Sequence, residues 1–355
     1  MELLILNKSF QPVSILEGYT SLIWTKRYYG YGDFELYIAA DSALLDVLQK
    51  DFFITRSDDE SVMIIEKIEI KTDVENGDYF IITGRSLESI LLRRVFDRQY
   101  FMNSTSTLAL VVQSFFIECT TNRDSSVLRP RTYRQIPNLY IDTSSSFDGT
   151  MNVQFTGDTL YSAIVSVCQP REVGFKITLS GSIMTLYLYQ GDEVDVEFSP
   201  DFDNLISSDY SSDNSNIANT VYVAGEGEGS ERKIFTRCYF DRDVNPKAGL
   251  DLHEIWIDAR NISSNGGEIS RNDYDKMLET VANEAHAEHS IDESFEAEIE
   301  PQMTFAYKTD WNLGDIVTVK NAYGVISNPR IVEIIECWDE TGYSVIPTFD
   351  YLEVV

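Results

Sequence analysis

Two histidines at the end of a long polar segment have the spacing of a metal site. His286 and His289 lie three residues apart, so a helix would place both imidazoles on one face, with Glu288 or Asp292 as a further ligand. The pattern lacks the glutamate base of the His-Glu-x-x-His motif and lies in an acidic stretch. A solvated helix end is the favoured interpretation, and we expect no metal ion and no cofactor.

Nucleophilic catalysis has few residues to build on in this chain. His253 is the only other histidine, so a Ser-His-Asp triad has almost no base available. The 58 acidic residues offer many carboxylate pairs, but none stands out beside an aromatic platform as in a glycoside hydrolase. The Asp201-Phe202-Asp203 and Asp241-Arg242-Asp243 runs lack the glycine and distal glutamate of a calcium loop. We therefore expect no catalytic residues and no enzymatic activity.

A glycine-rich run has the glycine spacing of a phosphate-binding loop but the opposite charge. In Gly225-Glu226-Gly227-Glu228-Gly229 the two glutamates would repel a phosphate, and no Lys-Ser or Lys-Thr pair follows. The run is typical of a tight turn between strands. A contact between subunits is the sharper alternative, in which Arg232 and Lys233 pair with Glu226 and Glu228 across the boundary.

An aromatic segment from Trp24 to Ile38 could form a sugar platform or a packed hairpin. Apolar and polar side chains alternate from Phe34 onward, as in a strand with one buried face, and Gly30 and Gly32 supply a turn before it. Tyrosine and tryptophan bury large areas while their polar ends keep hydrogen bonds, so dense aromatic clusters are typical of cores and interfaces. We favour barrel packing or subunit contact for Trp24, Arg27, Tyr28, Tyr29 and Phe34.

The chain of 355 residues is strongly acidic, with a formal net charge of −30. Such a surface repels nucleic-acid phosphates and anionic membranes, which disfavours sequence-specific nucleic-acid binding. Cys119, Cys168, Cys238 and Cys337 are far apart, so we expect free buried thiols. The sequence has no leader pattern and no membrane-spanning run, which predicts synthesis in a cytoplasm and no membrane insertion.

The hydrophobic pattern predicts a β-rich chain with few helices, long enough for two or three cores. The Ser-, Asp- and Asn-rich segment 201–219 is expected to be a loop or domain crossing. Helices are expected at residues 43–48, 87–95, 105–120, 158–168 and 271–289. Strands are expected at 3–6, 14–16, 22–25, 34–38, 52–55, 61–72, 78–84, 140–141, 153–155, 174–179, 182–189, 219–224, 233–240, 303–308, 316–320, 330–338 and 343–348.

Four segments, in the family's order, resemble the tail-hub proteins of siphophages and prophages, the Gp37-like siphovirus tail proteins. They are Ser21 to Leu36, Asp78 to Phe96, Asn219 to Arg232, and Tyr307 to Val319 together with Arg330 to Phe349. The first contains Arg-Tyr-Tyr-Gly-Tyr-Gly-Asp-Phe-Glu-Leu and the last Trp-Asn-Leu-Gly-Asp. The residues expected to serve a barrel or an interface in the later segments are Glu226, Glu228, Arg232, Trp311 and Asp315.

The resemblance implies an α+β, predominantly β fold similar to that of contractile-tail baseplate hubs. Two small β-barrels like tail-tube subunits are expected, with α+β segments attached or inserted. The implied division is a first barrel at residues 1–98, an α+β domain at 99–200, a discontinuous second barrel at 201–240 plus 301–355, and an inserted segment with the long helix at 241–300.

The implied function is structural. A homotrimer would form a ring that adapts the six-fold tail tube to a three-fold tip and bounds a channel for DNA or the tape-measure protein. Expected partners are the distal tail or tail-tube protein, the tape-measure protein and, where one is present, a central spike, while DNA passes without specific binding. The protein would assemble in the bacterial host cytoplasm and reside in the virion tail.

The alternative from another class is a tail-associated enzyme that degrades the cell wall or acts on carbohydrate. Such an enzyme would need a catalytic pair of carboxylates in a cleft, and the sequence displays no such pair. Release of muropeptides from peptidoglycan would favour this alternative.

Overall fold

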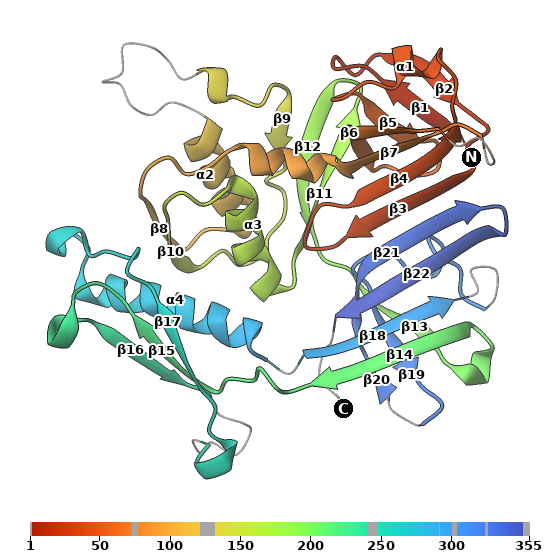
Figure 1. Cartoon of the computed structure of the whole chain (residues 1–355). Coiled ribbons are helices and arrows are strands. Elements are labelled where there is room, and N and C mark those ends of the chain that lie inside the picture. The colour runs from red at the N-terminus through yellow and green to blue at the C-terminus, as the bar shows by residue number, and fades with distance from the viewer. Residues whose placement is uncertain are drawn as a thin grey trace.

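A computed structural model describes residues 2–72, 77–120, 132–239, 247–290, 292–299, 304–323 and 326–350. These residues form two β-rich halves that lie edge to edge, a middle region with helices beside them, and an outer unit of strands and one long helix (Figure 1). We call them the first β half, the second β half, the middle region and the outer unit.

The first β half, residues 3–86, has a core of aliphatic and aromatic side chains. Phe34, Leu36 and Ile38 alternate with more exposed residues, so they share the buried face of one strand. Trp24 is fully buried in the same core. The elements are β1 (Leu3–Leu6), β2 (Pro12–Leu16), β3 (Ser21–Arg27), β4 (Asp33–Ala39), α1 (Leu44–Val47), β5 (Phe53–Arg56), β6 (Val62–Lys71) and β7 (Tyr79–Ser86).

The second β half has a separate core around Trp311. Phe198 packs edge to face against Trp311, with ring centroids 5.5 Å apart, and Phe349 joins this aromatic group. The strands are β13 (Glu193–Phe198), β14 (Leu205–Asp213), β18 (Asp292–Ile299), β19 (Ile316–Lys320), β20 (Ile326–Ser327), β21 (Arg330–Asp339) and β22 (Gly342–Asp350).

One sheet joins the two halves. β21 pairs antiparallel with β3, which sets Glu336 opposite Trp24 and Ile334 opposite Lys26. Through this pair, fourteen strands of the described residues form one sheet in the order β14-β18-β22-β21-β3-β4-β7-β6-β5-β1-β2, with β13, β19 and β20 off this path (Figure 1). The predominantly β, α+β fold is therefore confirmed. The order does not close on itself among these strands, so two closed barrels stay a prediction.

The middle region is fused to the first β half by a shared core. Leu6 and Phe53 of the first half belong to the same cluster of buried side chains as Phe115 and Phe175. Helix α3 begins after Thr159, whose hydroxyl accepts a hydrogen bond from a main-chain N–H of its first turn. The elements are a 3₁₀ helix (Leu87–Arg93), β8 (Tyr100–Ser104), α2 (Leu108–Thr120), β9 (Leu139–Ile141), β10 (Met151–Phe155), α3 (Leu160–Cys168), β11 (Gly174–Ser180) and β12 (Ile183–Tyr189).

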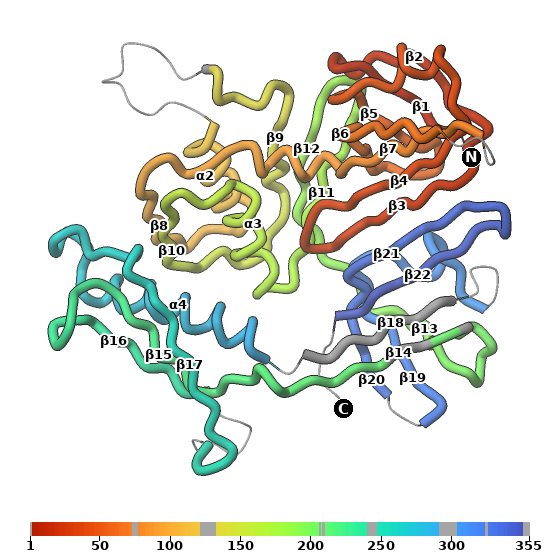
Figure 2. The backbone as a smooth tube through the Cα atoms, viewed as in Figure 1, coloured from red at the N-terminus to blue at the C-terminus, as the bar shows by residue number. Residues whose placement is uncertain are grey.

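The outer unit packs one helix on a small sheet. The elements are β15 (Thr220–Ala224), β16 (Ile234–Cys238), β17 (Glu254–Asp258) and α4 (Arg271–Glu288). β15 pairs with both β16 and β17, and Val221 and Val223 pack against the apolar face of α4. The unit lies beside the middle region, with α4 against β10 (Figure 2). The expected domain boundary between residues 240 and 241 falls inside this unit.

Most expected strands and the long helix are present, but only residues 214–219 of segment 201–219 form the loop or domain crossing that we expect from its composition. Residues 205–213 form β14, which pairs with β18 at one edge of the large sheet. Serine and aspartate suit an edge strand because one edge of such a strand faces solvent. A search for hydrophobic alternation therefore does not detect this strand. The strand expected at 303–308 is also wrong over residues 304–308, which lie in bends, an isolated bridge at Tyr307 and a turn, while residue 303 lies outside the described residues. The sequence pattern does not predict β8, β13, β17, β18 or β20.

Candidate functional site

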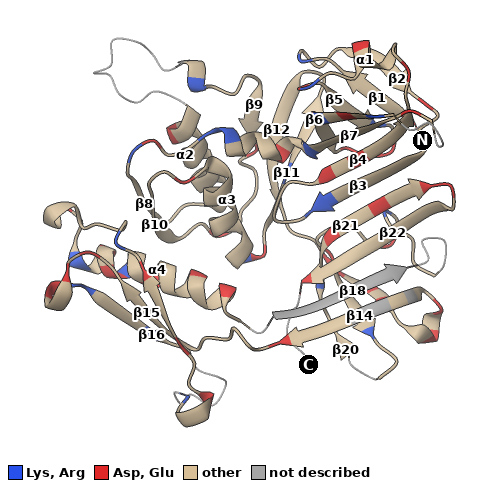
Figure 3. Ribbon diagram, viewed as in Figure 1, with Lys and Arg blue, Asp and Glu red and all other residues tan. Residues whose placement is uncertain are grey.

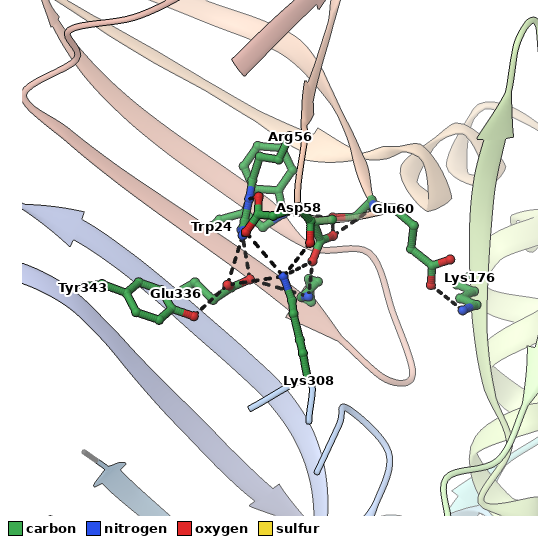
Figure 4. Close-up of polar contacts among 11 residues, drawn as sticks. Trp24, Arg56, Asp58, Glu60, Lys176, Lys308, Glu336 and Tyr343 are labelled. Atoms are coloured by element: carbon green, nitrogen blue, oxygen red, sulfur yellow. Dashed lines mark hydrogen bonds and ion pairs between the residues drawn. The ribbon is translucent and has the colours of Figure 1, made fainter. Parts of the chain in front are cut away.

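The two β halves meet at a group of charged side chains with a buried centre, which we call the junction cluster (Figure 4). Within the described residues, three cations and three carboxylates lie at ion-pair distance from one another, so their formal charges cancel. The first half contributes two of each sign, and the second half contributes one of each. The members are Lys26, Arg56, Asp58, Asp59, Lys308 and Glu336.

Arg56 and Glu336 form the contact at the centre of this cluster. The Arg56 side chain has no exposed surface, and that of Glu336 is 1% exposed. Two guanidinium nitrogens donate to the Glu336 carboxylate at 2.9 and 3.1 Å, and Arg56 also binds Asp58 through two hydrogen bonds. Burial alone would lower the pKa of Arg56, but Asp58 and Glu336 outweigh it and raise the pKa. The bidentate geometry fixes the angle between the halves as well as their separation.

Two ammonium groups hold Asp59 in its charged form. Lys26 Nζ lies 2.6 Å from an Asp59 carboxylate oxygen, and Lys308 Nζ lies 3.0 Å from the same oxygen. Burial acts to raise the pKa of Asp59, but the two lysines and the Ser61 hydroxyl outweigh it and hold the pKa far below its usual range. A variant that removes one charge would leave a buried partner unpaired, which is strongly destabilising.

Tyr28 ties the middle region to the same joint. Its main-chain N–H donates to the Val332 carbonyl of the second half at 2.8 Å, and its carbonyl accepts from Phe175 N–H of the middle region at 3.2 Å. Its buried hydroxyl lies 3.0 Å from the carbonyl oxygen of Glu172 and 3.1 Å from that of Tyr189. One residue at the end of β3 therefore contacts all three regions.

Two glycines make room for the Tyr28 ring. A Cβ on Gly174 would lie 2.3 Å from the ring, and one on Gly314 would lie 2.4 Å from it. Gly314 also has a φ of +98°, which side chains rarely allow. The next residue, Asp315, accepts a hydrogen bond from Asp192 N–H at 3.0 Å, and burial raises its pKa. The Asn-Leu-Gly-Asp turn is thus shaped to hold the ring.

A cavity of about 430 Å³ lies beside the cluster, where the three regions meet. Two of its lining acids form ion pairs: Asp59 with the two lysines, and Glu60 with Lys176 of β11, a pair that links the first half to the middle region (Figure 4). The buried Glu88 carboxylate accepts a hydrogen bond from Ile177 N–H at 2.6 Å, and burial raises its pKa. These contacts fit a structural joint, because Asp59 and Glu60 each hold two regions together.

The aromatic segment expected to pack or to contact another subunit lies at and beneath this joint. Trp24 and Phe34 belong to the core of the first half, and Tyr29 packs edge to face on Tyr28 with ring centroids 4.7 Å apart. Arg27 bridges the halves by ion pairs with Asp33 and Glu333. Packing within the chain accounts for all of them, and their contact with another subunit stays a prediction.

Trp311 and Asp315 lie in the second half, but the three residues of the glycine-rich turn lie apart in the outer unit. Arg232 donates to Asp258 at 2.6 Å and to the Ala224 carbonyl at 2.8 Å. Glu226 accepts from Ser264 N–H at 2.9 Å. Glu228 is exposed on the turn. The first two have partners within the chain, and pairing across a subunit boundary stays a prediction.

The histidine pair has structural contacts. His286 stacks on Tyr239 with ring centroids 3.6 Å apart, and its Nδ1 lies 2.8 Å from the Ala218 carbonyl oxygen. His289 Nδ1 lies 2.9 Å from the Ala285 carbonyl oxygen. Over the described ranges, the structure contains no group of three His, Cys, Asp or Glu side chains placed to hold a metal ion. In the same ranges, no helix has the length and apolarity to cross a membrane.

Reasoning from sequence misses the junction cluster, because its members lie in distant segments. Arg56 and Glu336 are separated by 280 positions. The sequence contains one indication of the cluster. Glu336 alternates with Ile334 and Trp338 on one face of a strand, so its carboxylate should point into an apolar layer. A charged residue at such a position calls for a buried partner.

The fold is that of prophage tail proteins. The chain is similar to the 43 kDa tail protein of prophage MuSo2 from Shewanella oneidensis, with a TM-score of 0.59 and 12% identity over 99% of this chain and 98% of that one. It is similar to a tail protein from Neisseria meningitidis MC58, with a TM-score of 0.60 and 10% identity over 98% and 95%. A chain of the Francisella PdpA-VgrG complex is matched at a TM-score of 0.51 and 13% identity, over 99% of this chain and 57% of that one.

The chain belongs to the Siphovirus ReqiPepy6 Gp37-like protein family, whose model matches residues 2–349. The family membership expected from the four sequence segments is thereby confirmed. No curated protein sequence matches this chain.

Proposed function

We propose that this chain is the structural hub of a phage or prophage-like tail tip or baseplate. Three copies form a ring that adapts the six-fold tail tube to a three-fold tip. Each copy supplies two β halves, so three copies supply six, which is the number that a six-fold tube requires. Membership of a siphovirus family and the fold shared with prophage tail proteins support this role.

The observation that carries the proposal is the joint between the halves. A ring adapter must hold its two tube-facing units at one fixed angle, because an error in either unit would leave a gap in the ring. Pairing of β21 with β3, the junction cluster and Tyr28 together hold that angle.

The net charge supports the channel part of the proposal. A chain with a net charge of −30 repels DNA, so we expect DNA to slide past it without specific binding. The proposed partners are two further copies, the distal tail or tail-tube protein, the tape-measure protein and any central spike. The proposed location is the virion tail, after assembly in the bacterial host cytoplasm.

We propose the same division of the chain as before: a first barrel at 1–98, an α+β domain at 99–200 and a second barrel interrupted by an insertion. Pairing of β15 with both β16 and β17 supports assigning residues 220–239 to the insertion rather than to the second barrel.

Light scattering and electron microscopy of the purified chain, alone and mixed with its tail-tube protein, test this function. We expect particles of three copies that form a pierced ring. A Glu336→Leu variant should lose the ring because the angle is no longer fixed, whereas the exposed Glu193→Gln control should keep it. The proposal would be overturned if the chain stayed monomeric both alone and mixed with the tail-tube protein. Release of muropeptides from peptidoglycan by the pure chain would overturn it as well.

A further inference from the structure

A groove separates the middle region from the outer unit. It has a volume of about 750 Å³ and lies between α3 and β10 on one side and α4 and the end of β17 on the other. The two helices can be followed in Figure 1. Its walls therefore come from parts of the chain that are far apart in sequence.

The described polar lining of this groove carries negative charge and no positive charge. None of the described lining residues is lysine or arginine. Gln154 donates through Nε2 to the Asn261 carbonyl at 3.1 Å, and its buried Oε1 has no partner among the described residues. The lining carboxylates are Asp158, Asp258, Glu284, Glu288 and Asp350, and acidic positions recur along α4 (Figure 3).

The rest of the lining is apolar. It comes from β10, α3, β17 and α4 and includes both aromatic and branched side chains. An occupant would therefore bury apolar surface while its charged groups meet the carboxylates. The main apolar residues are Phe155, Tyr161, Val165, Ile257, Ile262 and Val281.

Two carboxylates on α4 have no cation of their own. Across the described ranges, Glu284 and Glu288 make no ion pair and accept no hydrogen bond. Burial, Glu288 and Asp158 raise the pKa of Glu284 to about 7. Arg171 acts in the opposite direction, but its guanidinium already donates to three main-chain carbonyls. The repulsion between the two glutamates is thus only partly relieved within the chain.

We propose that this groove binds a basic segment of a partner protein in which lysine or arginine alternates with apolar residues. A cation between Glu284 and Glu288 relieves their repulsion and supplies the positive charge that the lining lacks, and the alternate side chains cover the apolar wall. The same charges exclude DNA, phosphate and acidic peptides. This site is separate from the proposed ring function, and a chain that forms no ring could still bind the segment.

Fluorescence anisotropy with a dye-labelled hexapeptide of alternating lysine and leucine tests the site on the full chain. We expect saturable binding, and we expect the Glu284→Gln/Glu288→Gln variant to raise Kd about tenfold. The control is Glu17→Gln/Glu193→Gln, which removes the same charge from exposed positions outside the groove and should leave Kd unchanged. Thermal melts of both variants verify that each is folded.

Two further peptides separate charge from apolar contact. A glutamate-leucine hexapeptide should not bind, and a lysine-serine hexapeptide should bind several-fold more weakly than the lysine-leucine peptide. Equal loss of affinity in the control variant would mean general attraction to an acidic surface and would overturn the proposal. Equal binding of the lysine-leucine and lysine-serine peptides would overturn it as well, because the apolar wall would play no part.

Discussion

The joint between the two β halves and the attachment of the outer unit are built in different ways. At the joint, a continuous sheet, the buried charges and Tyr28 act together. At the attachment, the polar side-chain contacts of the described residues to the middle region are single hydrogen bonds: Thr280 to the Asn152 carbonyl at 3.1 Å, Gln154 to the Asn261 carbonyl at 3.1 Å, and Asn103 to the Asp273 carboxylate at 3.5 Å. We therefore expect the first connection to break only on global unfolding and the second to open locally.

Replacement of Glu336 by leucine should produce the largest loss of stability. Arg56 would stay buried without its central partner, so we expect the free energy of unfolding to fall by about 3–5 kcal/mol in a urea titration. The matched control is Glu279→Leu, which breaks the half-exposed ion pair with Arg237 in the outer unit and should cost at most about 1 kcal/mol. Equal losses in the two variants would mean that the joint is no stronger than a surface contact.

Replacement of Tyr28 should produce the second-largest loss of stability. Tyr28→Ala empties the space between Gly174 and Gly314 and should cost about 3–5 kcal/mol by the same titration. Tyr28→Phe keeps the ring but removes the hydroxyl beside the carbonyls of Glu172 and Tyr189. We expect this variant to lower the free energy of unfolding by about 1–3 kcal/mol. A cost for Tyr28→Phe that matched Tyr28→Ala would contradict the packing role of the ring.

The two connections should also respond to pH in opposite directions. The pKa of Asp59 is lowered in the folded chain, so its stabilisation is present above the unfolded pKa of about 3.9 and is lost as pH falls below it. The pKa of Glu284 is raised to about 7 in the folded chain, so protonation of Glu284 favours the folded chain in acid. That contribution to stability is lost as pH rises from about 4.5 to 7. Acid therefore weakens the joint, and mildly alkaline conditions strain the outer unit.

Glu284→Gln isolates the second effect. The variant should be more stable than the native chain at pH 8, on the order of 1 kcal/mol after allowance for solvent screening, and equal to it near pH 4. Thermal melts at the two pH values measure the difference. An identical offset at both pH values would show that ionisation of Glu284 is not the cause.

The smallest effect is expected at the attachment itself. Thr280→Val removes the hydrogen bond to Asn152 and should cost about 0.5–1 kcal/mol. Hydrogen exchange should speed up for amides of α4 and stay unchanged for those of β21. Faster exchange in both elements would show that the two connections are energetically coupled.

The sequence predicts the local elements well where periodicity is strong. The stripe of α4 shows the period of a helix, and residues 316–320 form β19 with the expected bounds. The same reasoning misses β14, because its serines and aspartates resemble those of a loop and only pairing with β18 makes it a strand. Arg56 and Glu336 could not be paired from sequence, since a contact across 280 positions leaves no periodic signal.

The pairing of β3 with β21 sets the order of events during synthesis. Arg27 and Glu333 are 306 positions apart, so at about 5–20 residues per second the partner strand emerges roughly 15 to 60 seconds after β3. During that interval the edge of β3 is open to pairing with other chains, which is a route to aggregation. A folding nascent chain therefore depends on a strand made about 300 residues later to close the edge of β3.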